Sequence, residues 1–148
     1  MKNFIGTKHI KAEPMTRGQY NDFKGWPIPN DEDPNDPGYL VKYSDDYISW
    51  SSAAPFEKSY MEISENNTIT KQNIYDFIAW DKATKLGDKT TVLQVGLVNG
   101  FIITESSSCV DPKNFDMQVG TDICMERVHN KVWELLGFLL QTAVGGVQ

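Results

Sequence analysis

Two basic side chains near the end of the chain could hold a phosphate group. Arg127 and Lys131 lie four positions apart, so a helix would project both of them from one face, beside its apolar stripe. Arginine offers a planar fork of donors and lysine offers a point charge, which together can clamp a phosphate. The alternative is a solvated helix face on which Glu126 and Glu134 neutralise the two cations. Both interpretations stay open at this point.

Three further residues could contact a nucleotide. Phe101 directly follows an Asn99-Gly100 turn and could stack on a base, or it could be the first core residue of a strand. Asp111 and Asn114 precede the predicted helix, whose unpaired amides attract anions, so they could contact a ribose or close a pocket. Either side chain could instead be a helix cap. The candidate ligand-binding residues are therefore Phe101, Asp111, Asn114, Arg127 and Lys131.

No motif predicts a catalytic or metal site, and no cofactor is expected. Cys109, with His129 downstream, suggests a thiol nucleophile, but nothing around the cysteine places a base beside it. The two cysteines form neither a CxxC pair nor a spacing typical of zinc ligands. The stretch from Asp31 to Lys42 begins like a calcium loop, but Asp36 stands where the turn needs glycine. We therefore expect a binding protein rather than an enzyme.

A hairpin and a long helix must position these candidate residues. The runs Val92–Val98 and Phe101–Thr104 are rich in β-branched and aromatic residues, and the Asn-Gly between them predicts a tight I′ turn. Further on, apolar residues recur at three and four positions, which predicts a helix capped by Asp111 or Asn114 and reaching about Ala143. The apolar positions are Val128, Val132, Leu135, Leu136, Leu139 and Leu140.

A second helix is predicted before the hairpin. It would run from an N-cap at Thr70 to Leu86, with Gly87 ending it. The final helix is apolar around most of its circumference between residues 135 and 140, which is more apolar surface than one small sheet can cover. We therefore predict a homo-oligomer whose interface uses this end of the helix.

The start of the chain predicts a separate small module. Its expected elements are a strand over residues 4–10, a helix from Thr16 to Lys24, an irregular proline-rich loop over 26–38, a hairpin across 44–46 and a helical turn over 52–60. A polar linker follows from residue 64. The predicted fold is α+β, with a small β-rich module over residues 1–63. Residues 64–148 would form a small antiparallel sheet packed by two helices.

Composition excludes several classes of partner. The net charge is −6, and residues 1–63 and 64–148 each hold seven basic and ten acidic residues, or −3 each. Without a basic stripe, the chain would be repelled by duplex nucleic acid, so we expect no such partner. No run of about 18 apolar residues predicts a membrane span, and the first residues resemble no secretory signal.

The C-terminal half resembles a small tailed-phage protein family labelled after gene products 49 and 66 of two coliphages. The matching motifs, in order, are Asn99-Gly100-Phe101, Ser108-Cys109-Val110-Asp111-Pro112, Asn114-Phe115-Asp116, Val119-Gly120 and Trp133-Glu134-Leu135-Leu136-Gly137. In architecture the chain is also similar to the Thoeris anti-defence sponges, which bind cyclic ADP-ribose-type immune signals without cleaving them. The resemblance implies a base stacked on Phe101 and phosphates held by Arg127 and Lys131.

The N-terminal module resembles a recurrent phage segment that is joined to more than one downstream domain. Its matching residues are Met15-Thr16-Arg17, Tyr20-Asn21, Gly25-Trp26, Asp31-Glu32, Pro34, Gly38-Tyr39-Leu40-Val41, Tyr43 and Tyr47-Ile48-Ser49-Trp50. This resemblance implies an accessory module.

These observations lead to two hypotheses about function. The first is a phage counter-defence protein that sequesters a cyclic nucleotide-type signal in the cytoplasm of the infected bacterial host, in pockets near a subunit interface. The alternative is an oligomeric phage accessory protein that binds a host protein through its aromatic-rich first module and takes no small-molecule ligand.

Overall fold

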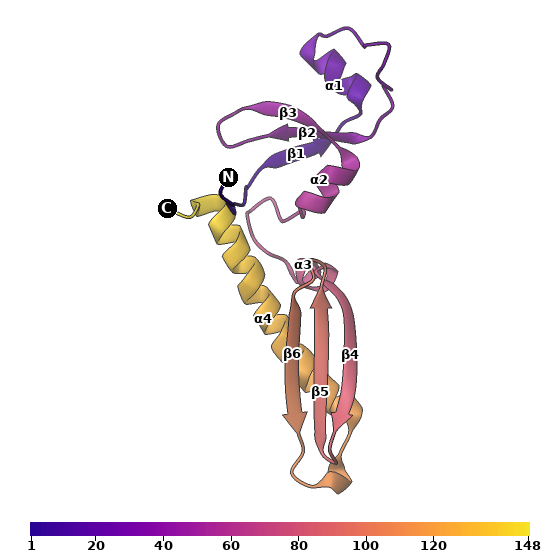
Figure 1. The fold of residues 1–148 in the computed structure, drawn as a ribbon, viewed down its shortest axis with the longest axis vertical. Helices are drawn as coiled ribbons and strands as arrows, with labels where there is room; N and C mark the ends of the chain where they lie inside the picture. Colours follow the sequence, from indigo (N-terminus) through magenta and orange to yellow (C-terminus); the bar gives the residue numbers. More distant parts are fainter. The chain divides into compact units, whose positions relative to one another are not determined.

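The computed structural model describes all residues from 1 to 148 and divides them into two compact units. The first unit contains residues 1–62 and 142–148, and the second contains residues 63–141. Each unit holds one three-stranded antiparallel sheet together with helices (Figure 1). The fold is α+β, as the sequence predicts.

The first strand of the first unit begins later in the sequence than predicted. Its elements are β1 (Lys11–Pro14), α1 (Arg17–Lys24), β2 (Gly38–Lys42), β3 (Ile48–Ser52) and α2 (Ala53–Ser59), and the sheet order is β1-β2-β3. The strand expected over residues 4–10 is wrong, because β1 pairs with β2 from Lys11 opposite Lys42, and β2 has no residue left to pair with earlier positions. Phe4 and Ile5 are accordingly more than 90% exposed.

The helix and hairpin predicted for this unit are confirmed. Thr16 is the N-cap of α1 and forms a reciprocal capping box with Gln19, while Gly25 ends the helix in the left-handed conformation. The turn between β2 and β3 is closed by the Tyr43 amide, which donates to the Tyr47 carbonyl. The loop between α1 and β2 is irregular, as its prolines predict.

The second unit is built on the sheet order β4-β5-β6. Its elements are α3 (Lys71–Asp76), β4 (Ile78–Leu86), β5 (Thr90–Leu97), β6 (Ile102–Ser108), the short 3-10 helix η1 (Pro112–Asn114) and the long helix α4 (Met117–Gly145), whose last residues continue beyond this unit. None of the helices in the chain combines the length and apolar character that crossing a bilayer requires.

The helix predicted from Thr70 to Leu86 is wrong beyond its first turns. Thr70 caps α3 as expected, but α3 ends at Asp76 and the following residues form β4, which pairs antiparallel with β5. The two alanines, the lysines and the leucine of this stretch favour a helix locally, and pairing with the apolar β5 overrides that preference. Gly87, with φ of +67°, turns the chain between β4 and β5 instead of ending a helix.

The predicted hairpin between β5 and β6 is confirmed, but its turn is not of type I′. Only Gly100, with φ of +87°, is left-handed, whereas a I′ turn requires positive φ at Asn99 too. The Gly100 amide donates to the Leu97 carbonyl, and the Leu97 amide donates to the Phe101 carbonyl. The connection is therefore a three-residue loop with glycine at its left-handed position.

Helix α4 covers one face of this sheet with a stripe that repeats every four residues. The buried helix residues are Gly120, Cys124, Val128, Val132 and Leu136, and the buried sheet residues include Thr91, Leu93, Val95, Leu97 and Ile103. Of the predicted apolar positions, Val128, Val132 and Leu136 belong to this stripe, whereas Leu135 and Leu139 are about 40% exposed. At the helix start, Gly120 lies directly on Thr91, and a β-carbon on Gly120 would overlap the Thr91 hydroxyl oxygen.

The close approach at Gly120 gives a stability prediction. Gly120→Ala should lower the free energy of unfolding by about 1–3 kcal/mol, because the added carbon forces the helix away from Thr91. Gly137→Ala is the matched control in the same helix, since nothing lies within 4 Å of its built β-carbon. That control should be neutral or raise the free energy by about 0.5–1 kcal/mol. Urea unfolding measures both, and equal effects of the two changes would contradict the contact.

Candidate ligand-binding site

Two of the predicted residues, Phe101 and Lys131, line one hollow of the second unit. The hollow has a volume of about 400 Å³ and lies where the start of β6 meets α4, with Leu135 and Glu134 on its helix side. Phe101 is 54% exposed, so it is not a core residue. An exposed aromatic ring beside an ammonium group can take a planar, negatively charged ligand.

Both predicted cations are engaged with β6. Lys131 forms an ion pair with Glu105, whose side chain is only 13% exposed, and the Lys131 side chain itself remains 52% exposed. Arg127 lies one helical turn earlier and donates from Nη1 to the Ser106 carbonyl at 2.8 Å. Arg127 lines neither this hollow nor the second one described below. The two basic side chains therefore connect α4 to the edge strand β6 and also remain exposed to solvent.

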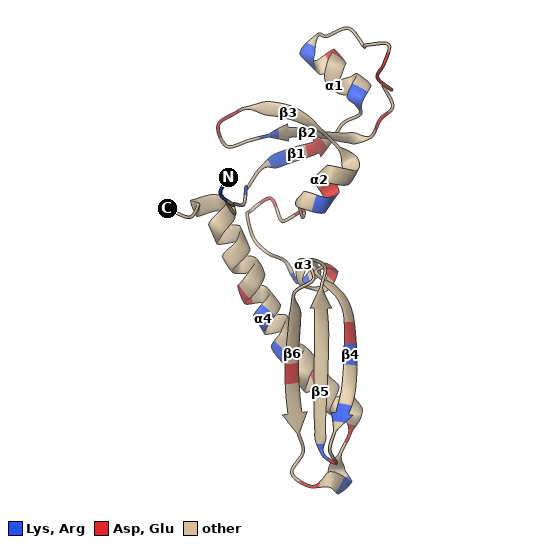
Figure 2. Cartoon of the chain, in the orientation of Figure 1, with Lys and Arg blue, Asp and Glu red and all other residues tan.

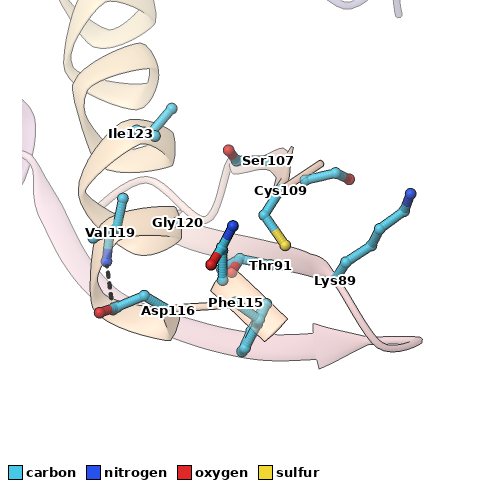
Figure 3. A pocket seen from close by; sticks show the side chains of 11 residues that line it. Lys89, Thr91, Ser107, Cys109, Phe115, Asp116, Val119, Gly120 and Ile123 are labelled. Carbon is cyan, nitrogen blue, oxygen red and sulfur yellow. Dashed lines mark hydrogen bonds between the residues drawn. The ribbon is translucent and has the colours of Figure 1, made fainter. Parts of the chain in front are cut away.

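A second hollow, of about 210 Å³, lies at the N-terminus of α4 (Figure 3). Asn114 is among the residues that line it. Asp116 caps the helix there, with its carboxylate accepting the Val119 amide at 3.0 Å. This corrects the prediction that Asp111 or Asn114 caps the long helix. Asp111 lines neither hollow and instead caps η1, accepting the Lys113 amide at 2.9 Å.

The polar wall of this second hollow includes residues that sequence reasoning missed. Thr91 and Ser107 are paired across β5 and β6 and both line it. Thr91 is only 1% exposed. The sequence did contain a signal for Thr91, because it is the first residue of the alternating series Thr91-Leu93-Val95-Leu97. A polar residue on a buried strand face normally has a partner, which marks the position as unusual.

The two hollows lie toward opposite ends of β6. Phe101 is at the start of the strand, and Ser107 and Ser108 are at its end, with Glu105 and Ser106 between them. At the usual rise of a strand, Ile102 and Ser108 are about 20 Å apart. The structure thus brings Phe101 and Lys131 together and leaves Asn114 at a separate place on the same unit.

The cysteines and the histidine of this unit are not arranged as a nucleophile and base. Cys124 is a fully buried residue of α4, and burial raises the pKa of its thiol. The Cys109 thiol donates to the Asp111 carbonyl at 3.2 Å, while His129 packs edge-on against the Tyr75 ring with centroids 5.2 Å apart. No group of three or more His, Cys, Asp or Glu side chains is placed to hold a metal ion.

Comparison with known proteins connects the second unit with phages. Residues 63–144, more than half of the chain, match the family described as "Phage protein (N4 Gp49/phage Sf6 gene 66) family". The matched range contains all five candidate ligand-binding residues and both hollows. No curated protein and no solved structure matches the chain.

The contact between Lys131 and Glu105 can be measured as a coupling energy. A double-mutant cycle with Glu105→Gln and Lys131→Met should give about 0.5–1 kcal/mol in urea unfolding, because the carboxylate is largely buried while the ammonium is exposed. The matched cycle pairs Glu105→Gln with Lys113→Met, which makes no ion pair with Glu105, and should give no coupling. A zero value for the first cycle would contradict the pair.

Proposed function

The chain belongs to the phage protein family of N4 Gp49 and phage Sf6 gene 66, and we propose that it sequesters a cyclic nucleotide-type immune signal of the cyclic ADP-ribose kind without cleaving it. The observation that supports this most is the half-exposed Phe101 beside Lys131 at the 400 Å³ hollow. That volume is within the range of about 300–1,000 Å³ usual for small-molecule sites.

The aromatic ring and the basic side chain of the hollow, together with Arg127 one helical turn away, have proposed roles toward such a ligand. Phe101 stacks on the base, since every base presents a π-face and the ring is accessible. Lys131 binds a phosphate in competition with Glu105, and Arg127 binds a second phosphate with the donors that its Ser106 contact does not use. Charge-assisted hydrogen bonds of this kind are the strong ones in anion recognition.

The Asp111–Asn114 loop takes part from a second subunit. The length of β6 places Asn114 about 20 Å from the Phe101 hollow of its own chain, which is too far for one small ligand to span. A homo-oligomer removes this difficulty, because the loop of a neighbouring copy can close over the ligand. The exposed apolar residues of α4 support such an assembly, and they are Trp133, Leu135, Phe138 and Leu139.

Sequestration without cleavage fits the side chains around the hollows. The Cys109 thiol faces a backbone carbonyl rather than a base, and His129 packs on Tyr75. A protein that lowers the free concentration of a signal needs tight binding and slow release, and it needs no reaction step. We place this activity in the cytoplasm of the infected bacterial host, where an immune nucleotide has to be intercepted.

Calorimetry with isomers of cyclic ADP-ribose tests the proposal, with cyclic dinucleotides as comparison ligands. Binding should be saturable, and the ligand should be recovered intact after the protein is heated. Phe101→Ala and Arg127→Ala should each weaken binding by at least about tenfold, equivalent to about 1.4 kcal/mol.

Lys82→Ala is the matched control, because Lys82 is an exposed basic residue of β4 that lines neither hollow and lies outside the Asp111–Asn114 loop. It should bind as the wild type does, and all variants should keep the same sedimentation coefficient. Two results contradict the proposal: no heat with any of these nucleotides, or unchanged binding by Arg127→Ala. The second result would favour the alternative function, an accessory protein that binds a host protein.

A further inference from the structure

Acidic side chains accompany the two cations at the Phe101 hollow. The charged residues among those that line the hollow are Lys131 and Glu134, and Lys131 is already paired with Glu105. Arg127 lies one helical turn before Lys131 and contacts β6. Two positive and two negative groups therefore lie at the hollow, and their charges sum to zero.

Glu105 is in direct contact with one of these cations. Its side chain is 13% exposed, whereas the Lys131 side chain that it contacts is 52% exposed. Figure 2 shows the acidic segment of β6 beside the basic segments of α4. A carboxylate with so little access to water needs a nearby cation. An anion that enters the hollow therefore competes with Glu105 for Lys131.

The charge of a phosphate group depends on how often it is esterified. A terminal phosphate is linked once, loses its second proton with a pKa of about 6, and carries about −1.5 to −2 at pH 7. A phosphate that is linked twice has no second proton and carries a single negative charge, as each phosphate of a nucleic acid backbone does. The phosphates of a cyclic nucleotide are of this second kind. The two kinds therefore differ by almost one charge.

A hollow without net charge treats these two kinds of phosphate differently. Lys131 and Arg127 can each balance one phosphate charge. A terminal phosphate brings almost one charge more, and that charge meets Glu105 and Glu134 instead of a further cation. Like charges placed against each other reduce affinity, and specific sites combine attraction of one ligand with repulsion of its competitors.

We propose that Glu105 and Glu134 determine the specificity of the Phe101 hollow: they admit nucleotides whose phosphates are all linked twice and repel nucleotides with a terminal phosphate. This inference rests on the proposed function, because it concerns the ligand of the same hollow. Every base can stack on Phe101, and two unopposed cations would also hold the common nucleoside mono-, di- and triphosphates of a cell, which all have a terminal phosphate. Repulsion of these nucleotides leaves the hollow vacant for the cyclic signal.

The test compares cyclic adenosine monophosphate with linear adenosine monophosphate, which share their base and sugar and differ in how the phosphate is linked. Amide chemical-shift titrations of the full-length protein measure both affinities, even where binding is weak. Glu105→Gln should raise the affinity for the cyclic nucleotide about threefold and for the linear one about tenfold, because nearly twice the charge nearly doubles the interaction energy and so squares the fold-change. Glu134→Gln should act in the same direction by a smaller factor, since an exposed charge is screened.

Matched controls separate this role from a change in total charge or in stability. Glu126→Gln removes the same charge from another exposed glutamate of α4, which lines neither hollow, and both affinities should stay as in the wild type. A purely structural role of Glu105 predicts that both nucleotides bind more weakly, or equally well, in Glu105→Gln. Glu134→Gln provides a second reading where Glu105→Gln lowers stability, because the Glu134 side chain is exposed.

Three outcomes overturn the inference. They are equal gains for the two nucleotides in Glu105→Gln, no gain for the linear nucleotide in either hollow variant, and the same gain in Glu126→Gln. Titration of the wild type with isomers of cyclic ADP-ribose separates this result from the proposed function. A wild type that binds no such isomer, with a gain for the linear nucleotide in Glu105→Gln, would refute sequestration and keep the selection by charge. Tight binding of an isomer without that gain would do the reverse.

Discussion

The packing of α4 on the β4-β5-β6 sheet determines the surroundings of the candidate site. Val128 and Val132 are completely buried against the sheet, and Arg127 and Lys131 each immediately precede one of them. Because neighbouring positions on a helix are about 100° apart, burial of the two valines directs the two cations to the border of the contact. There they meet Ser106 and Glu105 of β6, and the hollow beside Phe101 follows from that arrangement.

The sequence predicted correctly those elements whose signals lie within a short stretch of the chain. The helix that begins after Thr16, the two hairpins and the long helix α4 all have signals in residues close in sequence, and the structure contains them. The strand β4 was mistaken for a helix because its identity depends on pairing with β5. The strand expected over residues 4–10 failed for a similar reason, since the length of β2 decides where β1 can start.

The candidate site was predictable in part, and the missing part depends on tertiary geometry. Spacing alone put Arg127 and Lys131 on one helix face, but their partners on β6 depend on how the strand and helix meet. Sequence proximity suggested that the Asp111–Asn114 loop joins the Phe101 hollow, whereas β6 separates them along its length. Asn114 of that loop lines a separate hollow together with Thr91. The contact between Thr91 and Gly120 at this hollow depends on how α4 packs on the sheet, which the sequence does not show.

A crystal structure of the protein grown with a cyclic ADP-ribose isomer tests the central claim most directly. The account predicts the intact ligand between Phe101 and Lys131, with its base on the ring, its phosphates on Lys131 and Arg127, and Asn114 of a neighbouring subunit closing over it. A ligand bound away from β6 and α4, or a Phe101 hollow that stays empty at saturating ligand, would contradict the account.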